Sequence, residues 1–154
     1  MMLSQFLDFE AIRIDLAVNN KRQLVNQLAQ IAGARLSFDP AMIAAALGER
    51  ERLGSTGFGG GVAIPHGKLP GLERVYALAV RLSTPIDYKA IDGGKVDLVF
   101  LLLSPPDTGA EHLKALAAIS RLVRHAPTVE KLRGARSRDA LAAVLLGADE
   151  RDAA

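Results

Sequence analysis

The strongest fold signal in this chain is a nearly continuous apolar run, Val-Asp-Leu-Val-Phe-Leu-Leu-Leu, at residues 96–103. A short run of this kind between turn residues is typical of a strand that is buried on both faces in the middle of a sheet. Turn residues bound it at 92–94 (Asp-Gly-Gly) and at 104–106 (Ser-Pro-Pro). The chain must therefore supply covering layers on both sides of this strand.

Shorter segments on both sides of the run show strand or helix periodicity. Alternating or short apolar segments predict further strands, at 11–16, 62–64 and 75–82. Apolar residues spaced three or four apart predict helices, at 20–33, at 40–53, from 109 onward and from 138 onward. Strands that alternate with helices around a buried strand indicate an α/β fold, with helices on both faces of one sheet.

Capping residues and breakers set the expected ends of these elements. The strand at 75–82 is expected to end at Thr84-Pro85, and Gly33 lies near the end of the first helix. The helix starts are expected at Asp39 followed by Pro40, at a capping box Thr108–Glu111, and at Ser137. We expect residues 1–150 to form one domain, with fraying from 148 and a frayed tail at 151–154.

Composition excludes several classes of protein. The chain has no cysteine, which excludes disulfide scaffolds, Cys-type zinc or iron–sulfur sites and a thiol nucleophile. Its net charge of +2 is too small for binding by basicity alone, and it has no Trp. No apolar run approaches the length of a membrane span, and the N-terminus lacks the basic region of a signal peptide. A cytoplasmic protein without membrane insertion is therefore expected.

The most unusual segment is residues 54–67, Gly-Ser-Thr-Gly-Phe-Gly-Gly-Gly-Val-Ala-Ile-Pro-His-Gly. Five glycines among its first eight residues indicate tight turns or a close backbone approach, because glycine costs entropy and buries no side chain. The spacing matches no nucleotide motif. Neither Gly-Lys pair in the chain is followed by Ser or Thr, and the glycines do not fit G-x-G-x-x-G.

Two histidines are candidates for chemistry. His66 follows the expected strand at 62–64 and is fixed between Pro65 and Gly67, where an imidazole can be exposed and reactive. His112 lies in the first turn of the helix that starts at 109, on its apolar face, where burial and the helix N-terminus favour a neutral ring. Each also has a plain structural interpretation, as a turn histidine and a core histidine. We interpret His125 as structural.

Arginines precede the glycine segment, at the end of the second expected helix. Arg50 can fold over the glycines toward an anion, although a solvated helix end is an equal alternative on chemistry alone. For Arg52 the solvated position is the preferred interpretation.

These residues together resemble a known family. Arg50-Glu51, Gly54-Ser55-Thr56-Gly57 and Ala63-Ile64-Pro65-His66-Gly67 are similar to the EIIA phosphocarrier domains of the fructose/mannitol class in the bacterial phosphotransferase system. The resemblance extends to His112 and the last helix, and so covers nearly the whole chain. Ala-Ile-Pro-His-Gly-Lys-Leu in a chain without EIIB or EIIC parts is most similar to the nitrogen-regulatory branch.

The resemblance implies a role for each residue of the motif. His66 is implied to be the phosphorylated nucleophile, Arg50 a phosphoryl-binding arginine and His112 the second active-site histidine. The phosphoryl-binding loop is implied to comprise Gly54, Ser55, Thr56, Gly57 and Gly67, whose backbone N–H groups would hold phosphoryl oxygens. One departure is visible at Gly60, where the family often has a polar residue.

The resemblance also implies a mixed sheet flanked by helices and a place in a relay. Neutral His66 would accept a phosphoryl group from an HPr-type phosphocarrier, without a metal or another cofactor on the protein itself. The phosphorylated protein would act on downstream regulatory partners. The alternatives are transfer to a separate EIIB of a sugar transporter, or a docking-only regulatory module.

Two other classes of function have weaker support. Residues 121–138 carry six Lys and Arg against one Glu, but no aromatic residue lies among them, so a solvated surface is preferred over nucleic-acid binding. A metal hydrolase is excluded because the chain lacks metal ligands at helical or turn spacing. The three histidines include no H-x-x-x-H pair.

Overall fold

The computed structural model describes the backbone of residues 1–153 and the side chains of 1–152. The strands are β1 (Arg13–Leu16), β2 (Gly57–Gly59), β3 (Val62–Ala63), β4 (His66–Lys68), β5 (Tyr76–Ile86) and β6 (Val96–Ser104). The helices are α1 (Lys21–Leu36), α2 (Pro40–Arg52), α3 (Gly109–Arg124), α4 (Ala126–Gly134) and α5 (Arg138–Ala153). Two short 3₁₀ segments, Leu3–Gln5 and Phe9–Ala11, precede β1.

The strands form one mixed sheet in the order β1-β5-β6-β3-β2, and β4 also pairs with β6. β1 is parallel to β5, β5 is antiparallel to β6, and both β3 and β4 run parallel to β6. The apolar run at 96–103 is therefore the central strand, as predicted. Only Asp97 of β6 is less than fully buried.

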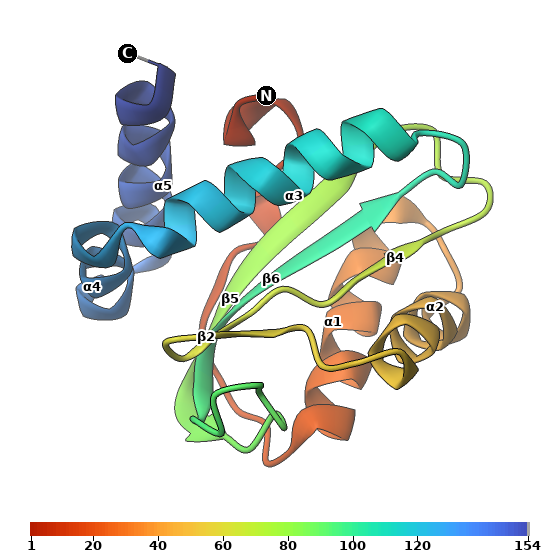
Figure 1. Cartoon of the computed structure of the whole chain (residues 1–154), viewed down its shortest axis with the longest axis horizontal. Helices are drawn as coiled ribbons and strands as arrows, with labels where there is room; N and C mark the ends of the chain where they lie inside the picture. The colour runs from red at the N-terminus through yellow and green to blue at the C-terminus, as the bar shows by residue number, and fades with distance from the viewer. Residues whose placement is uncertain (154) are drawn as a thin grey trace.

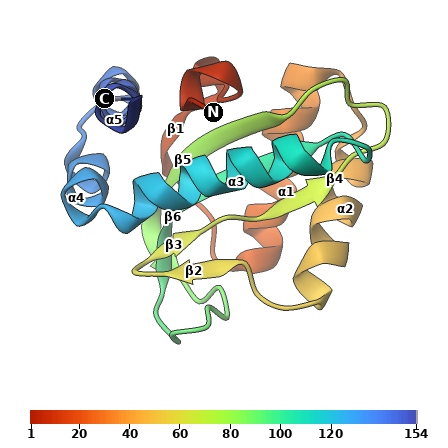
Figure 2. The same ribbon diagram turned by 45° about the horizontal axis from the view of Figure 1, so that its top comes forward.

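Helices cover both faces of the sheet, which confirms the predicted fold class (Figures 1 and 2). Leu98, Phe100 and Leu102 of β6 pack in a core with apolar residues of α3, α4 and α5. The alternate residues Val99 and Leu101 pack in a second core with α1 and α2. The period-two alternation of β6 thus feeds two separate cores. None of the helices in the described part of the chain has the length and apolar character of a membrane span.

One predicted element end is wrong, and another lies a few residues further along the chain. β5 continues through Thr84-Pro85 to Ile86, because its pairing with β6 is irregular between Arg81 and Ile86, where a proline without an N–H is tolerated. α1 continues past Gly33 to Leu36 and ends at Ser37, which has a left-handed conformation. Gly33 is instead a contact residue, since a Cβ there would lie 2.8 Å from the Phe38 carbonyl oxygen.

The predicted caps are confirmed except for one. The Asp39 carboxylate accepts a hydrogen bond from the N–H of Ala41, and the Ser137 hydroxyl accepts one from Ala140. The Thr108 capping box is wrong, because the Thr108 hydroxyl donates to the Pro105 carbonyl at 3.0 Å instead of capping α3.

The C-terminal region departs most from the sequence prediction. Helix α4 was not predicted, and α5 is helical as far as Ala153, through residues where the sequence suggested fraying from 148 and a frayed tail at 151–154. Asp149 is 5% exposed, and its carboxylate accepts hydrogen bonds from the N–H groups of Leu3 and Ser4. This contact ties the end of α5 to the start of the chain. Residue 154 lies outside the described residues.

Candidate functional site

His66 is the first residue of β4, and not the end of a strand that begins at Val62 as the sequence suggested. β3 ends at Ala63, and β4 pairs in parallel with β6, with His66 opposite Leu102. Gly67 lets helix α2 pack closely on β4, because a Cβ at this position would lie 3.1 Å from the Ala46 carbonyl oxygen. This close packing brings the last turn of α2 beside His66.

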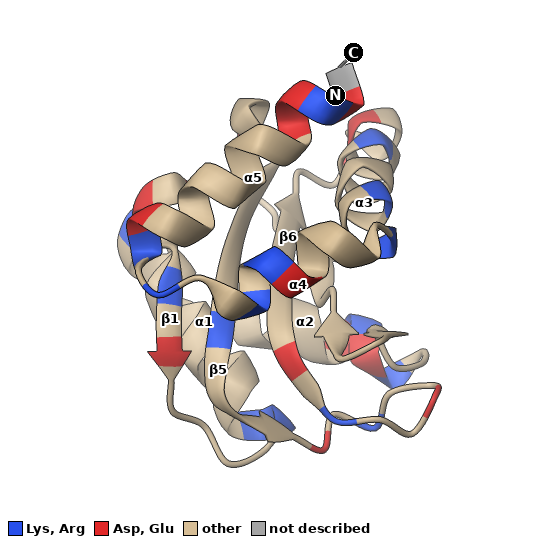
Figure 3. Ribbon diagram, turned by 90° about the vertical axis from the view of Figure 1, so that its left-hand side faces the viewer, with Lys and Arg blue, Asp and Glu red and all other residues tan. Residues whose placement is uncertain are grey.

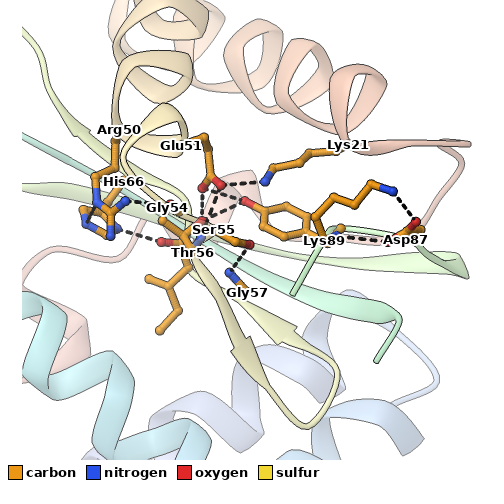
Figure 4. Close-up of polar contacts among 12 residues, drawn as sticks. Lys21, Arg50, Glu51, Gly54, Ser55, Thr56, Gly57, His66, Asp87 and Lys89 are labelled. Atoms are coloured by element: carbon orange, nitrogen blue, oxygen red, sulfur yellow. Dashed lines mark hydrogen bonds and ion pairs between the residues drawn. The ribbon is translucent and has the colours of Figure 1, made fainter. Parts of the chain in front are cut away.

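The two ring nitrogens of His66 have different partners (Figure 4). Nδ1 lies 2.8 Å from the Ile64 carbonyl oxygen, which can only accept a hydrogen bond. Nδ1 of His66 therefore carries the proton of the neutral ring, and Nε2 carries the lone pair. The Nε of Arg50 donates to this Nε2 at 3.2 Å.

Arg50 lies across the start of the glycine segment, one of the two positions that the sequence left open. Its Nη1 donates to the Gly54 carbonyl oxygen at 2.8 Å while its Nε reaches His66. Among the described residues its guanidinium takes part in none of the ion pairs. A cation held between a carbonyl and a neutral ring is suited to bind an anion that arrives at His66.

His112 of α3 is the third member of the site. Its ring centroid lies 5.5 Å from that of His66, and the residue is only 9% exposed, so it faces the core as predicted. Its Nδ1 lies 2.6 Å from the hydroxyl oxygen of Ser104, the last residue of β6. The structure thus brings together His66, Arg50 and His112, which are far apart in sequence.

Both rings are held in their neutral forms. Burial lowers the pKa of His66, and the charge of Arg50 lowers it further, against the opposing hydrogen bond to the Ile64 carbonyl. Burial lowers the pKa of His112 to about 4, with smaller contributions from Lys68 and His66. At neutral pH His66 therefore presents a nucleophilic lone pair.

Most backbone N–H groups at the start of the glycine segment already have acceptors within the protein, whereas the sequence suggested that they would hold phosphoryl oxygens. The N–H of Gly54 donates to the Glu51 carbonyl, that of Thr56 to the Glu51 carboxylate, and that of Gly57 to the Ser55 hydroxyl. Within the described residues, only the Ser55 N–H among these four amides lacks a protein acceptor. Of the expected loop, Ser55 has the free donor, whereas Thr56 and Gly57 maintain the loop itself.

Sequence reasoning missed a polar cluster beside the site, formed by Glu51, Thr56, Tyr88 and Lys21 (Figure 4). The Glu51 carboxylate accepts from the Thr56 hydroxyl, from the Tyr88 hydroxyl at 3.1 Å and from Lys21 Nζ at 2.6 Å. Lys21 also lies 4.2 Å from the centre of the Tyr88 ring. Burial raises the pKa of Glu51, but the Lys21 and Thr56 hydrogen bonds prevail and hold it below its usual value. The sequence signals were Glu51, within the Arg50-Glu51 motif, and Thr56, within the glycine segment, but neither indicated this cluster or its members Lys21 and Tyr88.

The glycine hairpin, in which Gly60 and Gly61 connect β2 to β3, is also fixed from two sides. The N–H of Gly60 donates to the Asp92 carboxylate, and its carbonyl accepts from Arg133 of α4 at 2.6 Å. Arg133 pairs with Asp97 of β6 as well, at 3.0 Å. Gly60 has a φ of +64° with open space at its Cβ position, so a short polar side chain such as that of Asn would fit there.

The remaining candidates lie elsewhere. The His125 ring contacts the Thr128 hydroxyl at the start of α4, which fits the structural interpretation. Acidic segments lie between the basic ones on α4 and α5, and two arginines of the basic stretch, Arg121 and Arg133, are paired with aspartates (Figure 3). Phe58 is 37% exposed and lies near the Arg124 guanidinium. Within the described residues, no cluster of His, Asp or Glu is arranged as a metal site.

Comparison with known proteins decides the family. The family described as "Phosphoenolpyruvate-dependent sugar phosphotransferase system, EIIA 2" matches residues 5–147. The chain belongs to this EIIA family. A nitrogen regulatory protein of Bradyrhizobium diazoefficiens is 46% identical over 145 residues, covering 94% of this chain and 95% of its own length. The nitrogen regulatory protein of Escherichia coli K12 is 36% identical over 142 residues, covering 92% and 87%.

Solved structures agree with this assignment. The nitrogen regulatory protein IIA-Ntr of Neisseria meningitidis superposes with a TM-score of 0.87 at 31% identity, over 93% of this chain and 98% of that chain. The mannitol IIA of Escherichia coli has a TM-score of 0.75 at 16% identity, over 90% and 97%, and shares the fold. The resemblance to EIIA domains, and to their nitrogen-regulatory branch, is confirmed.

Proposed function

We propose that this EIIA protein carries a phosphoryl group on Nε2 of His66 and acts through it as a phosphotransferase component with a regulatory role. The observation that carries the proposal is the arrangement of the His66 ring, with Nδ1–H donating to the Ile64 carbonyl and Nε2 facing the Arg50 guanidinium. A nucleophilic nitrogen beside an unpaired cation is what in-line phosphoryl transfer requires. Family membership supports the same chemistry.

The transfer step follows from these contacts. The lone pair on Nε2 attacks the phosphorus of a phosphohistidine on an HPr-type carrier, forming one N–P bond while the carrier's N–P bond breaks and its nitrogen keeps the electron pair. Positive charge develops on the His66 ring, and the Ile64 carbonyl stabilises it through Nδ1–H. Because one N–P bond replaces another, the step is close to balanced in energy and can run in both directions.

The other groups of the site would bind the phosphoryl oxygens. The Arg50 guanidinium neutralises charge without losing its contact to the Gly54 carbonyl, because its remaining N–H groups are available. His112 adds a donor without adding a full charge, and the Ser55 N–H is the available backbone donor of the loop. The pre-positioned donors have little to reorganise when the phosphoryl group arrives.

The partners follow from the family and its branch. An HPr-type phosphocarrier would be the donor, and regulatory proteins that distinguish the two phosphorylation states would be the downstream partners, in keeping with the similarity to nitrogen regulatory proteins. The alternative acceptor is an EIIB component. The related mannitol IIA was solved in a complex with phosphorylated IIB. The relay begins from phosphoenolpyruvate, so we place it in the cytoplasm.

Intact-protein mass spectrometry tests the proposal. The protein is mixed with enzyme I, an HPr-type carrier and phosphoenolpyruvate, beside the variants His66→Ala and His125→Ala. We expect one acid-labile phosphoryl group on the wild type and on His125→Ala, and none on His66→Ala. Labelling of folded His66→Ala would remove the nucleophile from His66. No labelling of the wild type with an active donor would leave a docking-only module as the function.

A further inference from the structure

The hydroxyl of Ser104 lies in a buried position behind His112. Ser104 is 0% exposed, and its Oγ lies 2.6 Å from Nδ1 of His112. Among the described residues this is the only hydrogen-bond partner of the Ser104 hydroxyl. The other ring nitrogen of His112, Nε2, has no hydrogen-bond partner among the described residues. Every fully buried side-chain nitrogen or oxygen of these residues does have a partner. Nε2 of His112 therefore keeps some contact with solvent, although the residue as a whole is 9% exposed.

The position of the ring proton follows from which arrangement satisfies the buried donors. If Nδ1–H of His112 donated to Ser104, the hydroxyl hydrogen of Ser104 would be buried without an acceptor, which carries a large desolvation cost. If the Ser104 hydroxyl donates to Nδ1, this hydrogen is satisfied and only oxygen lone pairs remain unused. The second arrangement is favoured, and a neutral His112 ring then carries its proton on Nε2.

We propose that Ser104 is a positioning residue that fixes His112 as the Nε2–H tautomer, so that the ring offers a hydrogen-bond donor at the mouth of the site. The inference rests on the proposed function, in which this donor meets an oxygen of the phosphoryl group on His66. The backbone carbonyl of Ile64 sets the opposite tautomer in His66. One histidine is thus held as the nucleophile and the other as the donor.

The chemical type of each partner explains this division. A carbonyl oxygen accepts only, so it holds a proton on the nitrogen it contacts, whereas a hydroxyl with no other acceptor gives its proton to the nitrogen. A carboxylate in place of Ser104 would hold the proton on Nδ1 of His112 and favour a charged ring. Serine supplies orientation and tautomer without charge, which leaves the lowered pKa of His112 in place.

The direct test is nitrogen-15 NMR of the histidine rings in the unphosphorylated wild-type protein at neutral pH, with His112 assigned from a His112→Gln sample. We expect His112 protonated on Nε2 and His66 protonated on Nδ1. A His112 ring protonated on Nδ1 overturns the inference. The measurement needs no phosphoryl transfer, so it separates a failure of this inference from a failure of the proposed function.

Variants at Ser104 supply the second arm. We expect Ser104→Ala to give a mixture of His112 tautomers, to leave the His66 tautomer unchanged as an internal control, and to slow phosphoryl acceptance roughly two- to tenfold, the range of one neutral hydrogen bond. Ser104→Thr keeps the hydroxyl and is expected to restore the Nε2–H tautomer. If folded Ser104→Ala retains a pure Nε2–H ring at His112 and the wild-type rate, Ser104 is not a positioning residue.

Discussion

Arg50 and Glu51 are neighbours at the end of α2, yet their side chains enter two different polar clusters (Figure 4). The Arg50 guanidinium meets the neutral ring of His66 and forms no ion pair with any described residue. The Glu51 carboxylate is fully engaged, by Thr56, Tyr88 and Lys21. One cluster is open and incomplete, and the other is closed and satisfied.

The two clusters can therefore have different roles, since one stabilises the loop and the other is able to bind an anion. The closed cluster ties the loop at Thr56 to α1 and α2, and its charges and donors match, so it has nothing left to offer a ligand. The open cluster keeps a cation and a nucleophilic nitrogen without an anion, an arrangement that the proposed function completes only when a phosphoryl group arrives. We therefore expect substitutions on the two sides to affect different measurements.

Arg50→Ala gives the largest expected effect of these comparisons. Loss of the pre-positioned cation should slow phosphoryl acceptance on the order of 100-fold without abolishing it, because His112 and the Ser55 N–H remain. The free energy of unfolding should fall by no more than about 1 kcal/mol, because the guanidinium forms no ion pair with the described residues and its hydrogen bonds to His66 and Gly54 are partly or fully exposed to solvent. Rapid-quench labelling measures the rate of phosphoryl acceptance, and urea unfolding measures the free energy of unfolding. An unchanged rate would remove Arg50 from the site.

Glu51→Gln tests the closed cluster. We expect the free energy of unfolding to fall by about 2 kcal/mol, because the Lys21 ammonium loses its anion in a largely buried position. The rate of phosphoryl acceptance should fall less than tenfold, since among the described residues Glu51 forms no hydrogen bond with His66 and affects its ring only through a minor charge interaction. Urea unfolding and the same labelling assay measure both. A large loss of rate in a protein of normal stability would contradict the division between the clusters.

The pH dependence of the free energy of unfolding is expected to differ between the wild type and His112→Gln. In the folded protein the pKa of His112 is about 4, whereas the unfolded chain takes up a proton near pH 6.5, so this residue's contribution to stability is present above pH 6.5 and is lost as pH falls toward 4. Between pH 7 and pH 5 the wild type should therefore lose roughly 1–2 kcal/mol more than His112→Gln. Urea unfolding at both pH values tests this. Parallel pH dependence in the two proteins would contradict a buried neutral His112.

The smallest effect on the free energy of unfolding is expected in the glycine hairpin, where two neighbouring glycines provide a matched pair of variants. Gly60→Asn should change the free energy of unfolding by less than about 0.5 kcal/mol, because Asn tolerates its positive φ and no atom lies within 4 Å of the Cβ position. Gly61→Asn should cost about 1–2 kcal/mol, because the Arg133 guanidinium would have to leave its contacts with Asp97 and the Gly60 carbonyl to make room for the Cβ. Thermal unfolding distinguishes them. Equal losses would mean that Arg133 does not fix this hairpin.

Local signals in the sequence predicted much of the fold, and together with the resemblance to EIIA domains they pointed to the candidate site residues. The apolar run at 96–103 identified the central strand, and Asp39 and Ser137 marked helix starts, because these patterns act within a few residues. His66, Arg50 and His112 were found through a motif and a helix-face argument. The structure brings them together in one site.

Long-range contacts explain what was missed. Tyr88 reaches Glu51 across 37 positions, and Asp149 reaches Leu3 across 146, and no local pattern marks either contact. The loop amides were expected to face an anion, but the Glu51 carboxylate binds the Thr56 N–H first. Ser104 was read only as the end of a strand, because its partner His112 lies in the next helix.

The most direct test of the account is the position of the phosphoryl group on the ring of His66. Nitrogen-15 histidine labelling combined with phosphorus-31 NMR of the phosphorylated protein would show which nitrogen is coupled to phosphorus. We predict coupling at Nε2 of His66, with the proton on Nδ1 retained and donated to the Ile64 carbonyl. Coupling at Nδ1, or at a ring nitrogen of His112, would contradict the proposed geometry of transfer.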